Sequence, residues 1–234
     1  MSGVMQGKTA SHLRYEGVVF DLDGTLVDSY AAITECYNHA CTSLGQPAVS
    51  PETVRGLVGH GLESLMEDAV GPAQVVRAVA LFQERYDVIC EERTTLLPGV
   101  AGTLPRLAAG GLRLGVATNK PTRFAVRILR ALGLMPPVRA VLGPGEGIPP
   151  KPRPEMLLKV LADLGVSRRQ ALYVGDMEID IETARRADVD VWVVPTGSCS
   201  RSQLMAASPD VLLGEFADLP RLLGARPAAG TDRS

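Results

Sequence analysis

Short apolar runs bounded by turn residues recur along the chain. The first, Gly17-Val18-Val19-Phe20, ends in the polar turn Asp21-Leu22-Asp23-Gly24-Thr25. Comparable runs occupy residues 112–117, 140–142, 171–174 and 189–194. Apolar stretches this short, closed by aspartate or glycine, are typical of strands buried on both faces of a parallel sheet.

Between these runs the apolar residues change to helical spacing. Residues 122–132 and 154–164 carry apolar side chains three and four positions apart, and the two segments end at Gly133 and Gly165. A glycine directly after the last periodic residue is a common helix stop. Strands that alternate with helices predict an α/β, Rossmann-like fold, in which helices cover both faces of a parallel sheet.

Residues 28–97 interrupt this alternation. The segment has no convincing buried strand, and its pattern predicts helices over residues 29–44, about 51–70 and 72–92. Its ten acidic residues and four arginines give a net charge of −6, whereas the rest of the chain, with sixteen acids and twenty basic residues, has a net charge of +4. We therefore expect an all-helical domain inserted between the first and second strands.

These features predict the domain boundaries. The α/β core is expected to comprise residues 15–27 and 98–223, and the helical insertion residues 28–97. Residues 1–14 and the segment 224–234, which is rich in alanine, glycine and arginine, are predicted to be disordered.

Composition excludes several classes of protein. With 46% hydrophobic and 21% charged residues, the 234-residue chain can bury a core. A formal net charge of −2 disfavours a nucleic-acid partner, and no apolar stretch is long enough to cross a membrane. The N-terminal residues lack the apolar segment of a secretory signal, and the four cysteines lack the spacing of a metal site. We expect a cytoplasmic protein with buried thiols.

Polar residues follow four of the predicted core strands at the carboxyl end, where open α/β sheets bind their ligands. In chain order they are Asp21, Asp23, Thr118, Asn119, Lys120, Lys151, Asp176 and Asp180. Several carboxylates at one edge repel one another unless a hard cation lies among them. Mg²⁺ suits a small set of oxygen ligands that shares the ion with water and a substrate phosphate. The pattern therefore predicts a magnesium site that can accept a substrate phosphate oxygen.

The use of lysine supports this interpretation. The chain has four lysines and twenty arginines, so a lysine inside a motif indicates a specific requirement. Lys151 follows a loop rich in proline and glycine, which favours a fixed position over a solvated loop cation. Lys120 is compatible either with the phosphate site or with the surface start of a helix.

Four motifs carry a family resemblance. Asp21-Leu22-Asp23-Gly24-Thr25, Thr118-Asn119, Lys151 and Gly175-Asp176-x-x-x-Asp180 resemble the motifs of the haloacid dehalogenase-like hydrolase superfamily. The insertion after the first motif is similar to the C1-type cap of that superfamily. Residues 54–61 and 117–122 resemble segments of the bacterial phosphoglycolate phosphatases. The likeness extends from about Gly17 to Leu223.

The resemblance implies a role for each core residue. Asp21 would be the nucleophile that forms an aspartyl phosphate, and Asp23 would protonate the leaving group and then activate water. Lys151 would neutralise charge on the phosphoryl oxygens, while Thr118 and the amide of Asn119 would hydrogen-bond them.

The resemblance also implies a metal site. Mg²⁺ would bind the carboxylates of Asp21 and Asp176 and the backbone carbonyl of Asp23. Asp180 would support this site through a metal-bound water or through Lys151.

The insertion is expected to close over the site as a cap, with hinges near residues 25–29 and 94–99. Arg55 would offset the negative charge of the cap near an anionic substrate, although a surface ion pair explains it equally well. His60 would either contact substrate or only form part of a cap loop. A closed cap favours a small phosphorylated metabolite over a phosphoprotein.

Several alternatives stay open. A β-phosphoglucomutase-like phosphotransferase shares the motifs and the cap type, and nucleotide monophosphates or pyrophosphate are alternative substrates. Dehalogenation is disfavoured because that activity goes with the absence of an acid at position 23, and phosphonate cleavage because residues 28–97 contain no lysine. A non-catalytic scaffold usually has a gap among the motif residues, and none is found here. We expect a monomer or a homodimer.

Overall fold

The computed structural model describes residues 14–145 and 147–224. The disorder predicted for residues 1–14 and 224–234 therefore falls mainly on residues outside the described part of the chain. At the described N-terminus, Arg14 contacts Asp190, with 2.6 Å between Nη2 and Oδ2.

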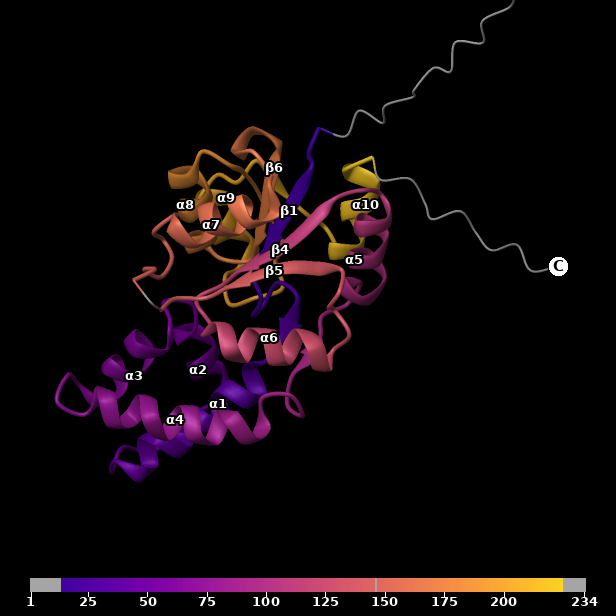
Figure 1. The fold of residues 1–234 in the computed structure, drawn as a ribbon. Helices are drawn as coiled ribbons and strands as arrows, with labels where there is room; N and C mark the ends of the chain where they lie inside the picture. The colour runs from indigo at the N-terminus through magenta and orange to yellow at the C-terminus, as the bar shows by residue number, and fades with distance from the viewer. Residues whose placement is uncertain (1–13, 146, 225–234) are drawn as a thin grey trace, which may run out of the picture.

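A parallel sheet of six strands forms the centre of the core, in the order β5-β4-β1-β6-β7-β8 (Figure 1). In that order the strands are β5 (Val138–Leu142), β4 (Arg113–Ala117), β1 (Gly17–Phe20), β6 (Ala171–Gly175), β7 (Asp190–Val193) and β8 (Val211–Leu212). The first five strands were predicted from their apolar runs. The edge strand β8 has only two residues, too few to show a pattern.

Helices cover both faces of the sheet, which confirms the predicted fold class. The helices are α5 (Val100–Ala109), α6 (Thr122–Ala131) and α10 (Leu219–Leu222) on one face, and α7 (Glu155–Leu164), α8 (Glu178–Ala187) and α9 (Arg201–Ala206) on the other. Successive residues of β1 point to opposite faces, so Val18 and Phe20 pack in one apolar cluster and Val19 in the other. Such burial on both sides explains the continuous apolar runs.

The insertion forms a separate helical layer next to the core, and we call residues 28–97 the cap (Figure 1). Its helices are α1 (Tyr30–Ser43), α2 (Pro51–Leu57), α3 (Leu62–Val70) and α4 (Val75–Ile89). The single helix expected over about 51–70 is two helices, because the chain turns at Gly59 and Gly61, whose φ angles are 140° and 97°. Such φ angles suit glycine and stop a helix.

A short antiparallel ribbon lies where the chain enters and leaves the cap. It pairs β2 (Val27–Asp28) with β3 (Thr95–Leu96). The sequence did not reveal it, because two-residue strands have no periodicity. The ribbon falls within the two segments expected to act as hinges, whose hinge role stays a prediction.

Cap and core meet through aromatic and charged contacts between α4 and α6. Tyr86 packs edge-on against Phe124, with ring centroids 4.9 Å apart. Nearby, Arg127 of α6 contacts Asp87 of α4 and Glu91, two residues after the end of α4, each at 2.8 Å. Part of the acidic charge of the cap therefore faces basic residues of the core. None of the helices in the described ranges has the length and apolar character needed to cross a bilayer.

Candidate active site

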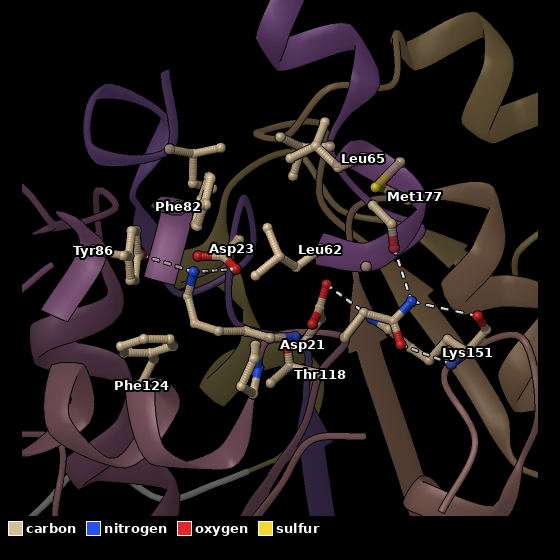
Figure 2. A pocket seen from close by; sticks show the side chains of 17 residues that line it. Asp21, Asp23, Leu62, Leu65, Phe82, Tyr86, Thr118, Phe124, Lys151 and Met177 are labelled. Carbon is tan, nitrogen blue, oxygen red and sulfur yellow. Dashed lines mark hydrogen bonds and ion pairs between the residues drawn. The ribbon is translucent and has the colours of Figure 1, made fainter. Parts of the chain in front are cut away.

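The carboxyl ends of three neighbouring strands bring the predicted motif residues to one place. The register pairs Phe20 at the end of β1 with Val116 of β4 and Val174 of β6. The residues that follow these strands therefore reach the same level at the sheet edge. A pocket between core and cap is lined by Asp21, Asp23, Thr118 and Asn119, together with Lys151 from the loop after β5 (Figure 2).

Lys151 is buried between two acids. Its ammonium nitrogen lies 3.0 Å from Asp21 Oδ2 and 2.7 Å from Asp180 Oδ1. The hydroxyl of Tyr173 lies 3.4 Å from the same nitrogen and donates to the carbonyl of Ala117 at 2.8 Å. Burial alone would lower the pKa of Lys151, but the two carboxylates outweigh it and raise the pKa above its ordinary value. The lysine is thus held in its charged form.

Asp180 is fully engaged by protein groups. One carboxylate oxygen pairs with Lys151, and the other accepts hydrogen bonds from the backbone amides of Asp176 and Met177 at 3.1 and 3.0 Å. These amides belong to the N-terminal end of α8, where an acidic side chain is favourable. Asp180 therefore orients Lys151 and the loop that carries Asp176.

Two other buried carboxylate oxygens of this site have no partner among the described residues. They are Oδ1 of Asp21 and Oδ2 of Asp176. Oxygens of Asp21, Asp176 and Asp180 lie within 4.8 Å of one another. Burial raises the pKa of Asp21 to about 6, and burial and the neighbouring acids raise that of Asp176 well above its ordinary range. Unpartnered carboxylates this close together fit a divalent cation with oxygen ligands.

Glycines make room for Asp176. A Cβ atom on Gly197 would lie 1.5 Å from Asp176 Oδ2, and one on Gly24 would lie 2.5 Å from it. Thr25 fixes the other oxygen by donating its hydroxyl proton to Asp176 Oδ1 at 2.6 Å. The carboxylate is therefore enclosed by backbone, with one oxygen left for a ligand.

The residues after β4 connect the core site to the cap. The Asn119 side chain donates to the carbonyl of Gly59 in the cap at 2.9 Å, and its oxygen accepts from the backbone amide of Lys151 at 2.7 Å. Thr118 is buried and its hydroxyl accepts from the amide of Lys120 at 3.3 Å. Thr118 and Asn119 both line the pocket beside Asp21.

Asp23 also lines the pocket but has different partners from Asp21. Ser29 donates its hydroxyl proton to Oδ1 of Asp23, and the Lys120 ammonium lies 3.0 Å from Oδ2. Lys120 also donates to the hydroxyl of Tyr86 at 2.8 Å. The structure thus excludes a surface position for Lys120, which is buried in the pocket. A contact with the phosphate stays a prediction.

The two predicted cap residues lie outside this pocket. Arg55 donates to the backbone carbonyls of Thr196 and Gly197 at 2.8 and 2.9 Å and stacks on the ring of Tyr30. His60 lines a separate hollow next to the pocket. A role of either side chain in binding substrate stays a prediction.

Apolar side chains of the cap form the wall opposite the acids. The sequence pattern marked the helices but not which residues face the core; they are Ile33, Val58, Leu62, Leu65, Phe82 and Tyr86. Met177 completes this wall from the core side, and a Cβ on Gly59 would lie 2.5 Å from its terminal methyl. An amphipathic helix shows that one face is buried, but not which partner covers it.

Known proteins resemble this chain over nearly its whole length. A family model described as haloacid dehalogenase-like hydrolase matches residues 18–194. A phosphoglycolate phosphatase of Yersinia pseudotuberculosis is 35% identical over 215 residues, which cover 89% of this chain and 93% of that protein. A phosphoglycolate phosphatase of Salmonella paratyphi A is 35% identical over 232 residues, with 89% and 92% covered.

Solved structures agree with the fold. A crystal structure of a protein from Lactobacillus delbrueckii subsp. bulgaricus superposes with a TM-score of 0.84 at 26% identity, covering 90% of this chain and 98% of that one. The family model, the relatives and the shared fold all extend across both the core motifs and the cap. The chain therefore belongs to the haloacid dehalogenase-like hydrolases.

Proposed function

We propose that the protein is a magnesium-dependent phosphatase that hydrolyses a small organic monophosphate, with phosphoglycolate as the first candidate, through an aspartyl phosphate on Asp21. The observation that carries this proposal is the arrangement of Asp21. Its carboxylate has one oxygen on Lys151 and one without a partner. Asp21 and Asp176 each offer a carboxylate oxygen within 4.8 Å of the other. An acid held in this way, at the base of a pocket, suits attack on phosphorus.

The chemistry divides between the two aspartates of the first motif. Asp21 attacks phosphorus, so that a bond from its oxygen to phosphorus forms while the ester oxygen leaves. Asp23 gives its proton to that leaving oxygen. Asp23 then takes a proton from a water molecule as the water attacks phosphorus, which breaks the bond to Asp21 and releases inorganic phosphate.

Positive charge and hydrogen-bond donors stabilise the transferring group. Lys151, fixed by Asp180, lies beside Asp21 where negative charge accumulates on the phosphoryl oxygens. Thr118 and Asn119 line the pocket, and the Thr118 hydroxyl and the Asn119 amide would bind the same oxygens. The carboxylates of Asp21 and Asp176 and the carbonyl of Asp23 would hold Mg²⁺, which when bound neutralises charge on the phosphoryl group.

The cap supports the choice of a small substrate. Apolar side chains of its helices, among them Leu62, Leu65 and Phe82, line the pocket and leave little polar surface for a large substrate. Relatives with 35% identity that bear the name phosphoglycolate phosphatase support the specific candidate. A cytoplasmic location and a monomeric or dimeric state stay predictions.

The direct test is a phosphate-release screen with Mg²⁺ over phosphoglycolate, a sugar phosphate, a nucleoside monophosphate and pyrophosphate. We expect phosphoglycolate to give the highest kcat/KM, and EDTA to abolish release until Mg²⁺ is restored. Full activity in metal-free buffer would contradict the metal site. A rearranged sugar phosphate as product, without free phosphate, would instead indicate a phosphotransferase.

A further inference from the structure

Lys120 is a buried cation beside the acid that transfers protons in the proposed mechanism. Its side chain is 7% exposed, and its nitrogen lies 3.0 Å from Asp23 Oδ2. The same nitrogen donates to the hydroxyl of Tyr86, which comes from α4 of the cap and is itself buried. Tyr86 and Asp23 are labelled in Figure 2, where dashed lines mark these two contacts. One core side chain thus contacts both an active-site acid and the cap.

Both oxygens of Asp23 are held by the protein. Ser29, directly before α1, donates to Oδ1, and Lys120 contacts Oδ2. Asp21 differs, because one of its buried oxygens has no partner among the described residues. The contacts therefore fix the orientation of the Asp23 carboxyl group, whereas Asp21 keeps an oxygen open to a ligand.

Two of the three lysines in the described ranges each contact one of the two acids of the first motif. Lys151 contacts Asp21, and Lys120 contacts Asp23. The third, Lys159, is exposed and pairs with Asp163 within one helix. In a chain that otherwise uses arginine, a compact ammonium group is the cation that fits between a carboxylate and a phenol in a closed pocket.

We propose that Lys120 is a positioning residue for Asp23. It holds the carboxyl group where the proton of Asp23 can reach the leaving oxygen, as the ester bond to phosphorus breaks and the bond to Asp21 forms. Its contact with Tyr86 makes this orientation depend on the closed cap. The inference rests on the proposed phosphatase function. Proton transfer requires donor and acceptor at hydrogen-bond distance, so a carboxyl group free to rotate transfers its proton less often.

The test compares Lys120→Met with wild type on two kinds of ester. Phosphoglycolate and ethyl phosphate release alkoxides, which need a proton, whereas 2,4-dinitrophenyl phosphate releases a stable anion that needs none. Because kcat/KM reports the steps up to loss of the leaving group, we expect a loss of about 100-fold on both alkyl esters and less than about 5-fold on the aryl ester. Lys159→Met is the matched control and should behave as wild type.

A double-mutant comparison separates positioning from substrate binding. If Lys120 acts through Asp23, then adding Lys120→Met to Asp23→Asn should cause little further loss on an alkyl ester. Tyr86→Phe keeps the ring and removes only the hydroxyl. It should therefore fold and show a smaller loss with the same dependence on the leaving group. Circular dichroism and thermal unfolding check the fold of each variant.

The outcomes distinguish this inference from the function on which it rests. If Lys120→Met lost kcat/KM equally on alkyl and aryl esters, the positioning role would be overturned and the phosphatase function would stand. The same holds if the loss of kcat/KM caused by Lys120→Met added to that caused by Asp23→Asn. A loss of kcat/KM on phosphoglycolate but not on ethyl phosphate would mean that Lys120 binds the substrate carboxylate. That result would also overturn the positioning role. A wild-type protein that releases no phosphate from any ester would remove the basis of both.

Discussion

Asp176 illustrates how single residues build this site. Its carboxylate is closed in by the backbone of Gly24 and Gly197, and one oxygen is fixed by Thr25. Gly24 has a φ of 82°, so both its backbone and its missing side chain are required there. Gly197 has no such φ, which leaves the close approach to Asp176 as the reason for glycine. The position of Asp176, the proposed metal ligand, thus requires that Gly24 and Gly197 have no side chain.

Gly197→Ala tests this dependence. The new methyl group would lie 1.5 Å from Asp176 Oδ2, so the carboxylate has to move. A displacement of this size costs activity on the order of 100-fold, and we expect the stabilisation of the protein by Mg²⁺ in thermal unfolding to decrease as well.

Gly102→Ala is the control, because a Cβ there meets no atom within 4 Å and the residue lies inside α5. It should leave activity unchanged and stabilise the fold by up to about 1 kcal/mol. Unchanged activity and Mg²⁺ response in Gly197→Ala would show that Asp176 does not hold the ion.

At the scale of elements, the start of α8 organises the charges of the site. Asp180 sits in the first turn, accepts from two backbone amides and pairs with Lys151. Met177 occupies the position before the helix, where a capping side chain is usual. Here Asp180 accepts from the amides of Asp176 and Met177, which have no partner within the helix. The Met177 side chain instead packs against Gly59 of the cap.

Asp180→Asn should lower activity by about 10- to 100-fold, because it removes one of the two carboxylates that hold Lys151 while keeping the size of the side chain. It should also lower the midpoint of thermal unfolding, since a buried cation loses a partner. Steady-state kinetics and calorimetry measure both effects.

Asp163→Asn provides the comparison for a surface acid. Asp163 pairs with Lys159 on the exposed face of α7. Such surface pairs contribute less than about 1 kcal/mol to the free energy of unfolding. If both variants behaved alike, the proposed role of Asp180 in orienting Lys151 would be wrong.

At the scale of the whole molecule, the cap and the core are joined by a charged contact as well as by the pocket. Arg127 of α6 contacts Asp87 of α4 and Glu91 just after that helix, and Tyr86 packs on Phe124. The net charge of −6 on residues 28–97 therefore serves, in part, to hold the cap against basic α6. The cations at the base of the pocket are separate from this contact.

Arg127→Ala removes two ion pairs between cap and core. Exposed pairs contribute up to about 1 kcal/mol each, so we expect KM to rise roughly three- to ten-fold at low salt. Added NaCl should raise the KM of wild type more than that of the variant, because salt screens the same contact.

Arg106→Ala is the matched control, since Arg106 is exposed on α5 and has no ion pair among the described residues. A KM and a salt response in Arg127→Ala equal to those of wild type would exclude a role of this contact in closure.

The sequence was most informative where several signals agreed. Five apolar runs located five of the six strands of the core sheet. The acids and the lysine that follow them converge at one edge of the sheet, as expected for neighbouring parallel strands. The contact of Lys120 with Asp23 was not predictable, because it joins two loops 97 positions apart through packing. The break near Gly59 and Gly61 was missed because both flanking segments have helical spacing. The apolar residues of the pocket wall could not be identified from the sequence, because they depend on how the cap packs against the core.

The central claim is that Asp21 carries the phosphoryl group, and Asp23→Asn allows this to be measured. With 2,4-dinitrophenyl phosphate the leaving group needs no proton, but release of phosphate from Asp21 still needs Asp23. We predict a burst of about one dinitrophenolate per active site, followed by slow turnover, and a phosphoryl group on the peptide that contains Asp21 by mass spectrometry after acid quenching. Steady release without a burst and without phosphorylation of Asp21, in a variant whose wild-type parent hydrolyses the ester, would contradict the account.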